Sequence, residues 1–275
     1  MNPLAIPPRT DARPGHTPRA LLALTLAAAL AFAAACASSP SPSSPSAATT
    51  AAAVNPSGAA PAGLPAGIND SFLDEEMDVS SYVERFEGES RAVYAERVAI
   101  TRALGLAPGD RIADIGAGTG FFTALFDAAV GPNGKTYAVE ISPQFLKHLR
   151  DRAEEENLQS VEVVEGTMTS VELPQSSIEI AFICDVYHHF ESPEATLASL
   201  FEAIRPGGEL VLIEFERIPG ETPAWLLKHV RAGRDVFQAE IEAAGFVWQD
   251  EIQLPGLDDN YIFRFKKPAT QSPAP

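Results

Sequence analysis

The sequence predicts an α/β fold: a mostly parallel seven-stranded sheet with helices on both faces and an antiparallel C-terminal hairpin strand. Short apolar runs alternate with helix-like runs from residue 90 onward. A glycine-rich turn from Asp114 to Gly120 joins one such strand to the helix that follows it. Two final strand-like runs flank the turn Pro255-Gly256-Leu257-Asp258-Asp259-Asn260. Alternating strands and helices favour a parallel sheet covered on both faces.

The first half of this pattern begins with a helix over residues 90–104, which carries an apolar stripe. The turn Pro108-Gly109-Asp110 leads into a strand at 111–113. A helix over 121–130 ends at Gly131-Pro132-Asn133-Gly134, a strong turn signal. A second strand covers 135–139 and ends at Glu140.

The second half repeats the alternation. A helix runs from Pro143, an allowed position for proline in a first turn, to about residue 155. Strands are expected at 161–164, 178–183 and 209–215, and helices at 193–204 and 234–244. Arg205-Pro206-Gly207-Gly208 should break the chain before the fifth strand. The final strands are expected at 246–252 and 261–265.

The glycine turn indicates a ligand site, because backbone N–H groups and a helix N-terminus meet there. Glycine lets the backbone turn sharply and lets a ligand approach closely. A dinucleotide fingerprint would need glycine at position 121, two residues after Thr119, and that position is Phe121. The turn therefore favours a nucleoside-bearing ligand and argues against an NAD-dependent oxidoreductase.

Candidate ligand-binding residues follow several of the predicted strands. They are Gly116, Glu140, Gly166, Asp185 and Glu214. Ligands on open α/β sheets bind beyond the carboxyl ends of the strands, near the point where strand order reverses. These residues should therefore lie at one edge of the sheet.

Charge and cysteine content exclude some classes of function. The 275 residues carry a formal net charge of −17. Without residues 1–36, 17 basic and 36 acidic residues remain, a net charge of −19. Such a surface repels phosphate backbones, so we expect no nucleic-acid partner. The two cysteines, Cys36 and Cys184, lie in unlike settings and do not suggest a disulfide.

The N-terminal sequence is typical of an export signal. Arg9, Arg13 and Arg19 precede a fifteen-residue apolar run from Leu21 to Ala35, which is short for a membrane span of about 20 residues. The end of this run, Phe32-Ala33-Ala34-Ala35-Cys36, resembles a bacterial lipobox, although leucine is commoner at the place of Ala33. The resemblance implies a lipidated Cys36 and a membrane-anchored lipoprotein facing the periplasm or cell exterior. Simple cleavage near Ala35, an ordinary membrane anchor and a cytoplasmic protein with an unused signal are the alternatives.

The remaining domain boundaries follow from composition. Residues 37–70 are rich in Ala, Pro and Ser and are predicted to be a disordered tether. Residues 71–267 form the predicted folded domain. Residues 268–275 are predicted to be a disordered tail.

With these elements in order, residues 90–267 resemble a class I S-adenosylmethionine-dependent methyltransferase, which has a Rossmann-like fold. Four segments carry the resemblance. They are the turn from Asp114 to Gly120, Glu140 at the end of the second strand, Phe182-Ile183-Cys184-Asp185, and Ile204-Arg205-Pro206-Gly207-Gly208. The resemblance implies S-adenosylmethionine as cofactor and in-line methyl transfer to a small-molecule acceptor at O, S or C.

The same resemblance assigns cofactor-binding residues. Glu140 takes the ribose hydroxyls, for which a carboxylate is a suitable bidentate acceptor. The set comprises Asp114, Gly116, Gly118, Gly120, Glu140, Thr167, Met168 and Asp185. Thr167 and Met168 stand where the family commonly has an aspartate that reads the adenine. Asp114 is expected to orient the turn rather than to take part in the chemistry.

The candidate catalytic residues are Asp185, His188 and His189, beside which the methyl acceptor is expected to bind. A histidine can take a proton from the acceptor because its pKa lies near neutrality. The alternative is a histidine packed under the cofactor. A metal site is not expected, because adjacent histidines do not easily face one ion from a strand or helix. The resemblance adds candidate substrate-binding residues, namely Tyr187, Glu214, His229, Arg231 and Arg234, and the alternative for both arginines is surface ion pairs.

Two functions of different class remain open at this point. One is a methyltransferase acting on a small molecule. The other is a non-catalytic envelope lipoprotein that keeps the fold as a ligand-binding or interaction module. The export signal motivates the second, because S-adenosylmethionine is made and used in the cytoplasm. The oligomeric state is not predicted.

Overall fold

The computed structural model describes residues 60–269. The predicted signal peptide with Cys36 and most of the predicted tether and tail lie outside the described residues.

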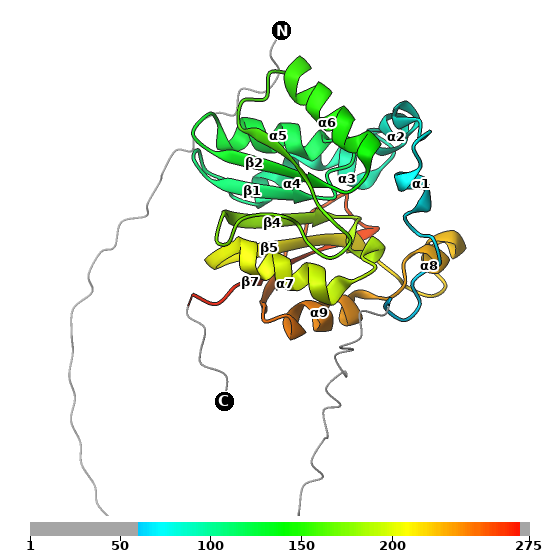
Figure 1. Cartoon of the computed structure of the whole chain (residues 1–275). Helices are drawn as coiled ribbons and strands as arrows, with labels where there is room; N and C mark the ends of the chain where they lie inside the picture. Colours follow the sequence, from blue (N-terminus) through cyan, green and yellow to red (C-terminus); the bar gives the residue numbers. More distant parts are fainter. Residues whose placement is uncertain (1–59, 270–275) are drawn as a thin grey trace, which may run out of the picture. The chain divides into compact units, whose positions relative to one another are not determined.

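The described part contains a seven-stranded sheet in the order β3-β2-β1-β4-β5-β7-β6 (Figure 1). Its strands are β1 (Arg111–Ile115), β2 (Lys135–Glu140), β3 (Val161–Glu165), β4 (Ile178–Cys184), β5 (Ile204–Phe215), β6 (Val247–Glu251) and β7 (Asn260–Lys266). Strands β1 to β5 pair in parallel, and β7 is antiparallel to both β5 and β6. Strand order reverses between β1 and β4. The predicted fold class is confirmed.

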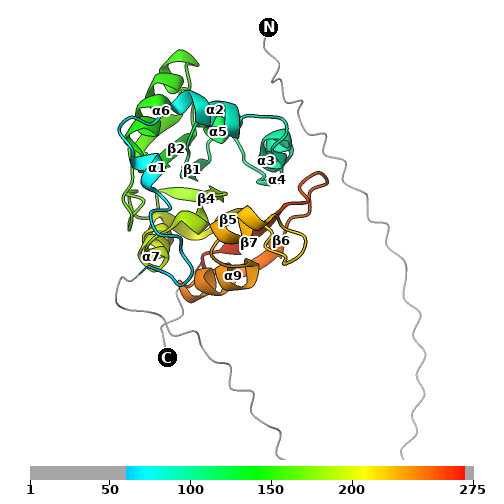
Figure 2. The ribbon, with the colours of Figure 1, turned by 90° about the vertical axis from the view of Figure 1, so that its right-hand side faces the viewer.

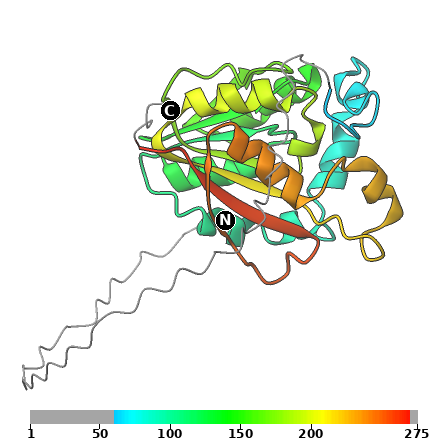
Figure 3. The same ribbon diagram turned by 90° about the horizontal axis from the view of Figure 1, so that it is seen from below.

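Helices cover both faces because side chains alternate along each strand. Phe182 of β4 packs edge-on against Phe122 and Phe126, with ring centroids 4.7 and 5.0 Å apart. Its neighbour Ile183 belongs to the opposite core, with Leu197. The helices of the first face are α3 (Ala92–Ala95), α4 (Arg97–Ala103) and α5 (Phe121–Val130), and α6 (Pro143–Glu155) contacts β2 and β3. The other face carries α7 (Pro193–Ala203) and α9 (Arg234–Ala243), which lie side by side (Figure 3).

Three details differ from the sequence-based expectation. The predicted break at 205–208 is part of β5, because Gly207 N–H and Gly208 C=O bond to Lys267 just beyond β7. The helix expected over 90–104 is interrupted at Glu96, which separates α3 from α4. The C-terminal hairpin crosses over, so that β7 lies between β5 and β6, an order that the sequence did not predict.

Residues before the predicted domain also belong to the fold. Ile68 and Asn69 are buried, so the predicted tether ends earlier than residue 70. Helices α1 (Asp70–Leu73) and α2 (Val79–Phe86) follow, and both lie against α6 (Figure 2). Phe72 packs against Phe145 of α6 with ring centroids 6.2 Å apart. Neither helix was predicted, and the same holds for α8 (Ala224–His229), which lies near the start of the described chain (Figure 1).

Among the described helices, none has the length and hydropathy that a bilayer crossing requires.

Candidate functional site

The glycine turn follows β1 at the point where strand order reverses. Gly116, Gly118 and Gly120 have φ values of 67°, 54° and 82°, which favour glycine. At Gly116 a Cβ atom would also lie 2.5 Å from the side chain of Val186. Beside Gly118 the nearest side-chain atom is Phe86 Cε2, 4.0 Å from where a Cβ would stand. The turn thus requires glycine for both backbone and packing, and α2 lies over it.

Glu140 ties the end of β2 to this turn. Its Oε2 accepts the N–H of Gly118 at 2.9 Å, and its Oε1 accepts the N–H groups of Ile141 and Ser142 at 2.7 and 3.0 Å. The residue is only 7% exposed, and this burial raises the pKa of its carboxyl. An ionised carboxylate offers about four acceptor positions, so about one remains for a ligand hydroxyl.

Asp114 lies buried beneath the turn. Its Oδ2 accepts the hydroxyl of Thr123 at 2.6 Å, which links β1 to the first turn of α5. Burial is the main cause that raises the pKa of Asp114 to about 7, and the nearby Glu140 adds to the effect. This geometry agrees with the expectation that Asp114 orients the turn.

The two residues expected near the adenine lie in the loop after β3. Thr167 is exposed, and its N–H bonds to the carbonyl of Ser170 in a tight turn. Met168 is half-buried, and its carbonyl accepts the hydroxyl of Thr196 at 3.3 Å. Both lie at the carboxyl end of the sheet, and their role in adenine binding stays a prediction.

Asp185 follows β4 and is held by two side chains. Arg91 donates to its Oδ2 at 2.6 Å, and Asn260 donates to its Oδ1 at 2.7 Å. Its side chain is 5% exposed. Desolvation raises the pKa of the Asp185 carboxyl, and Arg91 opposes that rise. In the structure described here Asp185 therefore joins the segment before α3 to the sheet, and its predicted catalytic and cofactor roles stay predictions.

Three histidines converge next to Asp185. His188 and His189 lie on a 3-10 turn (Tyr187–His189) after β4, and His229 ends α8. The ring centroids are 4.3 Å apart for His188 and His189, 4.9 Å for His188 and His229, and 5.1 Å for His189 and His229. The expectation that adjacent histidines do not easily face one ion assumed a strand or a helix, whereas the structure has a 3-10 turn that brings the two rings together.

Glu214 contacts this histidine cluster through His188. It is fully buried at the end of β5, and its Oε2 lies 2.8 Å from His188 Nδ1. The same oxygen accepts the backbone N–H of His188 at 3.2 Å. Glu214 thus contacts the acceptor side through His188.

Two of the rings are held in the neutral form by their surroundings. Desolvation, with the neighbouring His188, lowers the pKa of His189 to about 2. Desolvation also lowers the pKa of His229. Each neutral ring keeps one nitrogen lone pair available to a proton or a ligand.

Sequence reasoning missed Asn69. Its Nδ2 donates to the carbonyl of His189 and to Glu191, both at 3.0 Å, and its Oδ1 lies 3.2 Å from His189 Nδ1. An asparagine directly before a helix is usually interpreted as an N-cap. Asn69 precedes α1 but its side chain makes no cap hydrogen bond. Position in the sequence therefore gave no indication of this contact.

Tyr187, Arg231 and Arg234 have partners within the fold. Tyr187 donates its hydroxyl to Glu240 at 2.8 Å, and Arg231 makes two hydrogen bonds to the same carboxylate at 2.8 and 2.5 Å. The Arg231 side chain is 1% exposed. Arg234 pairs with Glu216 at 2.8 Å and with Glu251. Both arginines thus make ion pairs, as in the alternative, although the pair of Arg231 is buried and not at the surface. A role of the three residues in substrate binding stays a prediction.

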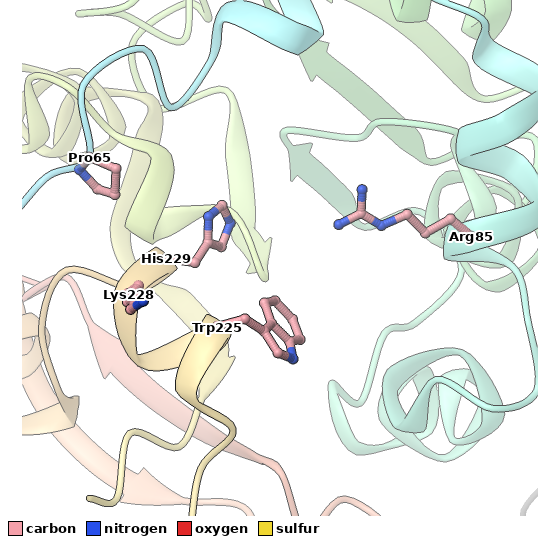
Figure 4. A pocket seen from close by; sticks show the side chains of 5 residues that line it. All are labelled: Pro65, Arg85, Trp225, Lys228 and His229. Carbon is pink, nitrogen blue, oxygen red and sulfur yellow. The ribbon is translucent and has the colours of Figure 1, made fainter.

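A cavity of about 330 Å³ opens beside His229. It is lined by Pro65, Arg85, Trp225, Lys228 and His229. Arg85 on α2 and Trp225 on α8 face the open space from opposite sides (Figure 4). Trp225 is 61% exposed, which is unusual for an indole. Two cations and an aromatic ring thus border the histidine cluster.

The central part of this sheet matches a known sequence family. A sequence family described as a methyltransferase domain matches residues 113–212, which run from β1 into β5 and include the glycine turn and Glu140. Residues 113–212 are therefore similar to a methyltransferase domain. The match implies S-adenosylmethionine as the cofactor of this domain and a methyl acceptor as its substrate.

Individual relatives cover a similar share of the chain. The ubiquinone/menaquinone biosynthesis C-methyltransferase UbiE of Ectopseudomonas mendocina (strain ymp) is 31% identical over 117 residues, 42% of this chain and 45% of the relative. An uncharacterised 37.1 kDa protein in transposon TN4556 of Streptomyces fradiae is 31% identical over 137 residues, 50% of this chain and 39% of the relative. The chain therefore spans less than half the length of these relatives.

Solved structures share the fold of the methyltransferase domain. An S-adenosylmethionine-dependent methyltransferase from Aquifex aeolicus superposes with a TM-score of 0.59 at 19% identity, over 70% of this chain and 98% of that one. The cyclase SpnF superposes with a TM-score of 0.54 at 16% identity, over 62% of this chain and 81% of that one. At such identities the likeness concerns the fold, and the activity must be argued from the site.

Proposed function

We propose that this protein transfers the methyl group of S-adenosylmethionine to a small-molecule acceptor at O, S or C. The observation that carries the proposal is the bond from Gly118 N–H to Glu140 Oε2 at 2.9 Å. It joins a ribose-binding carboxylate to the glycine turn of a methyltransferase domain at the edge of the sheet where ligands of such folds bind.

The residues present fit the cofactor. Glu140 keeps about one acceptor position for a ribose hydroxyl. Gly116 and Gly118 are half-buried with left-handed φ values, so no side chain covers the backbone of the turn at these two positions. When bound, the sulfonium supplies an already activated methyl group. The protein then mainly has to hold two reactants in line, which is a matter of positioning more than of acid–base chemistry.

The acceptor has to be argued from this chain's own residues. UbiE relatives are named for C-methylation in ubiquinone and menaquinone biosynthesis, but the family match ends at Leu212. The cavity residues Arg85, Trp225 and Lys228 fall outside that match. Two cations beside an exposed indole favour an acceptor that has an anionic group and a flat apolar body.

The experiment follows methyl transfer from radiolabelled S-adenosylmethionine to small-molecule fractions of a cell lysate. We expect label in a fraction of anionic compounds with the wild-type protein. The Glu140→Ala variant is the matched control and should give none. Cofactor binding without transfer to any fraction would contradict the enzymatic proposal and support a ligand-binding module.

We also propose that the chain is exported and lipidated at Cys36. The support is the arginine-flanked apolar run and the lipobox-like sequence before Cys36. Wild-type protein should incorporate palmitate in cells and show globomycin-sensitive processing. Cys36→Ser should lose the label, and an uncleaved protein in the cytosol would contradict the proposal.

A further inference from the structure

The three converging histidines have the composition of a metal site. Each of His188, His189 and His229 offers one ring nitrogen, and these three nitrogens lie within 4.8 Å of one another. We propose that these side chains bind a divalent transition-metal ion of the Zn²⁺ type, with an open coordination position for the methyl acceptor. The ion-binding part stands alone, and the role toward the acceptor rests on the proposed function.

The contact with Glu214 determines which nitrogen of His188 is free. An ionised carboxylate can only accept hydrogen bonds, so Nδ1 of His188 carries the proton in its 2.8 Å bond to Glu214. Nε2 then has a lone pair. A carboxylate that holds the far nitrogen of a metal-binding histidine fixes the ring and raises its basicity.

The contact with Asn69 determines which nitrogen of His189 is free. Its Nδ2 group donates to two oxygens, the carbonyl of His189 and the carboxylate of Glu191. The remaining Oδ1 must therefore accept, and Nδ1 of His189 donates to it at 3.2 Å. Nε2 of His189 is again the free nitrogen. Among residues 60–269, no hydrogen bond engages Nε2 of either His188 or His189.

The distances are compatible with one ion. Zn²⁺ binds imidazole nitrogen at about 2.0–2.1 Å, which places tetrahedral ligand nitrogens about 3.4 Å apart. Small rotations that bring the nitrogens together by about 1.5 Å or less would complete the site. Imidazole suits Zn²⁺ and neighbouring transition metals, whereas Mg²⁺ and Ca²⁺ prefer oxygen.

A three-histidine set leaves at least one position open, as in catalytic zinc sites. His229 lines the cavity bordered by Arg85, Trp225 and Lys228 (Figure 4). That cavity is therefore the direction from which an acceptor would reach the ion. An anionic oxygen or sulfur of the acceptor is the group that such a position takes.

The test uses the purified full-length chain, freed of metal with a chelator and titrated with Zn²⁺ by calorimetry and with Co²⁺ by visible absorption. We expect one ion per chain, sub-micromolar Zn²⁺ affinity and the d–d bands of four-coordinate cobalt. His229→Ala should weaken Zn²⁺ binding by more than about 100-fold, and Glu214→Gln by about 10- to 100-fold. His148→Ala removes a histidine of α6 outside the cluster and should leave affinity unchanged.

Each outcome decides the proposal. Absence of stoichiometric binding to the wild type, or unchanged affinity in His229→Ala, would overturn it. Thermal unfolding of the metal-free variants checks that they fold, and Glu214→Gln gives a graded loss if His229→Ala does not fold. S-adenosylmethionine binding is measured separately on the wild type. Its absence would contradict the proposed function without affecting the metal site, and metal binding can fail while cofactor binding persists.

Discussion

The carboxylate of Glu140 accepts the backbone N–H of Gly118 at 2.9 Å, although 22 residues separate the two in the chain. The bond joins the carboxyl ends of β2 and β1 where strand order reverses. One side chain therefore orders the glycine turn and is also the acceptor that we propose for the ribose. Two consequences can be measured, one on the carboxylate and one on the glycine turn.

Replacing Glu140 with Ala should reduce S-adenosylmethionine affinity by at least about 100-fold, because a charged hydrogen-bond acceptor and the order of the turn are lost together. Calorimetry measures the effect. Glu165→Ala is the matched control, because Glu165 pairs with Glu140 in the sheet register and is exposed. Equal affinities of the two variants would show that the ribose site lies elsewhere.

Gly116→Ala should destabilise the protein more than Gly105→Ala does. Both glycines have φ of 67°, so both substitutions impose the same backbone strain. Only at Gly116 would the added Cβ meet a neighbour, Val186 at 2.5 Å. The extra cost should be about 1–3 kcal/mol in the free energy of unfolding, measured in urea. Identical losses would mean that Val186 moves aside freely.

Asp114 should make stability depend on pH. Its pKa is raised from 3.8 to about 7 by burial, so the folded protein holds a proton that the unfolded chain releases in this window. Stability should therefore fall as pH rises from about 4 to 7, by about 4 kcal/mol from this group. Asp114→Asn removes that contribution, so its stability relative to wild type should rise across the window. Parallel pH profiles would contradict the assignment.

Arg91→Ala should destabilise the fold through Asp185. The variant leaves a carboxylate with a 5% exposed side chain and only Asn260 as a side-chain partner, at a cost of about 2–3 kcal/mol. Lys147→Ala breaks an exposed pair with Asp151 and should leave the free energy of unfolding nearly unchanged. Urea unfolding compares them. Similar small losses would mean that Asp185 does not depend on Arg91.

The sequence was sufficient to predict the sheet and the edge at which the candidate ligand-binding residues lie. Strands such as β4 alternate between two apolar cores, and the turn at Gly116 needs glycine, so both leave local signals that can be interpreted without a structure. Strand ends then place Glu140 and Asp185 at one edge. These predictions depend on periodicity and turn chemistry, which act over a few residues.

Contacts between residues far apart in the chain left no such local signal in the sequence. Asn69 reaches His189 across 120 positions, and the convergence of His229 with His188 depends on α8, which the sequence did not predict. The adjacency of His188 and His189 even argued against a common metal ion, because neighbouring side chains point in different directions in a strand or a helix. The 3-10 turn that unites them is set by tertiary packing on Glu214.

Calorimetric titration of the purified protein with S-adenosylmethionine measures whether the domain binds its proposed cofactor. We expect one site with a dissociation constant on the order of micromolar for the cofactor or its demethylated product, lost in Glu140→Ala but kept in Glu165→Ala. A protein that is folded by circular dichroism and gives no binding heat with either compound at several temperatures would contradict it.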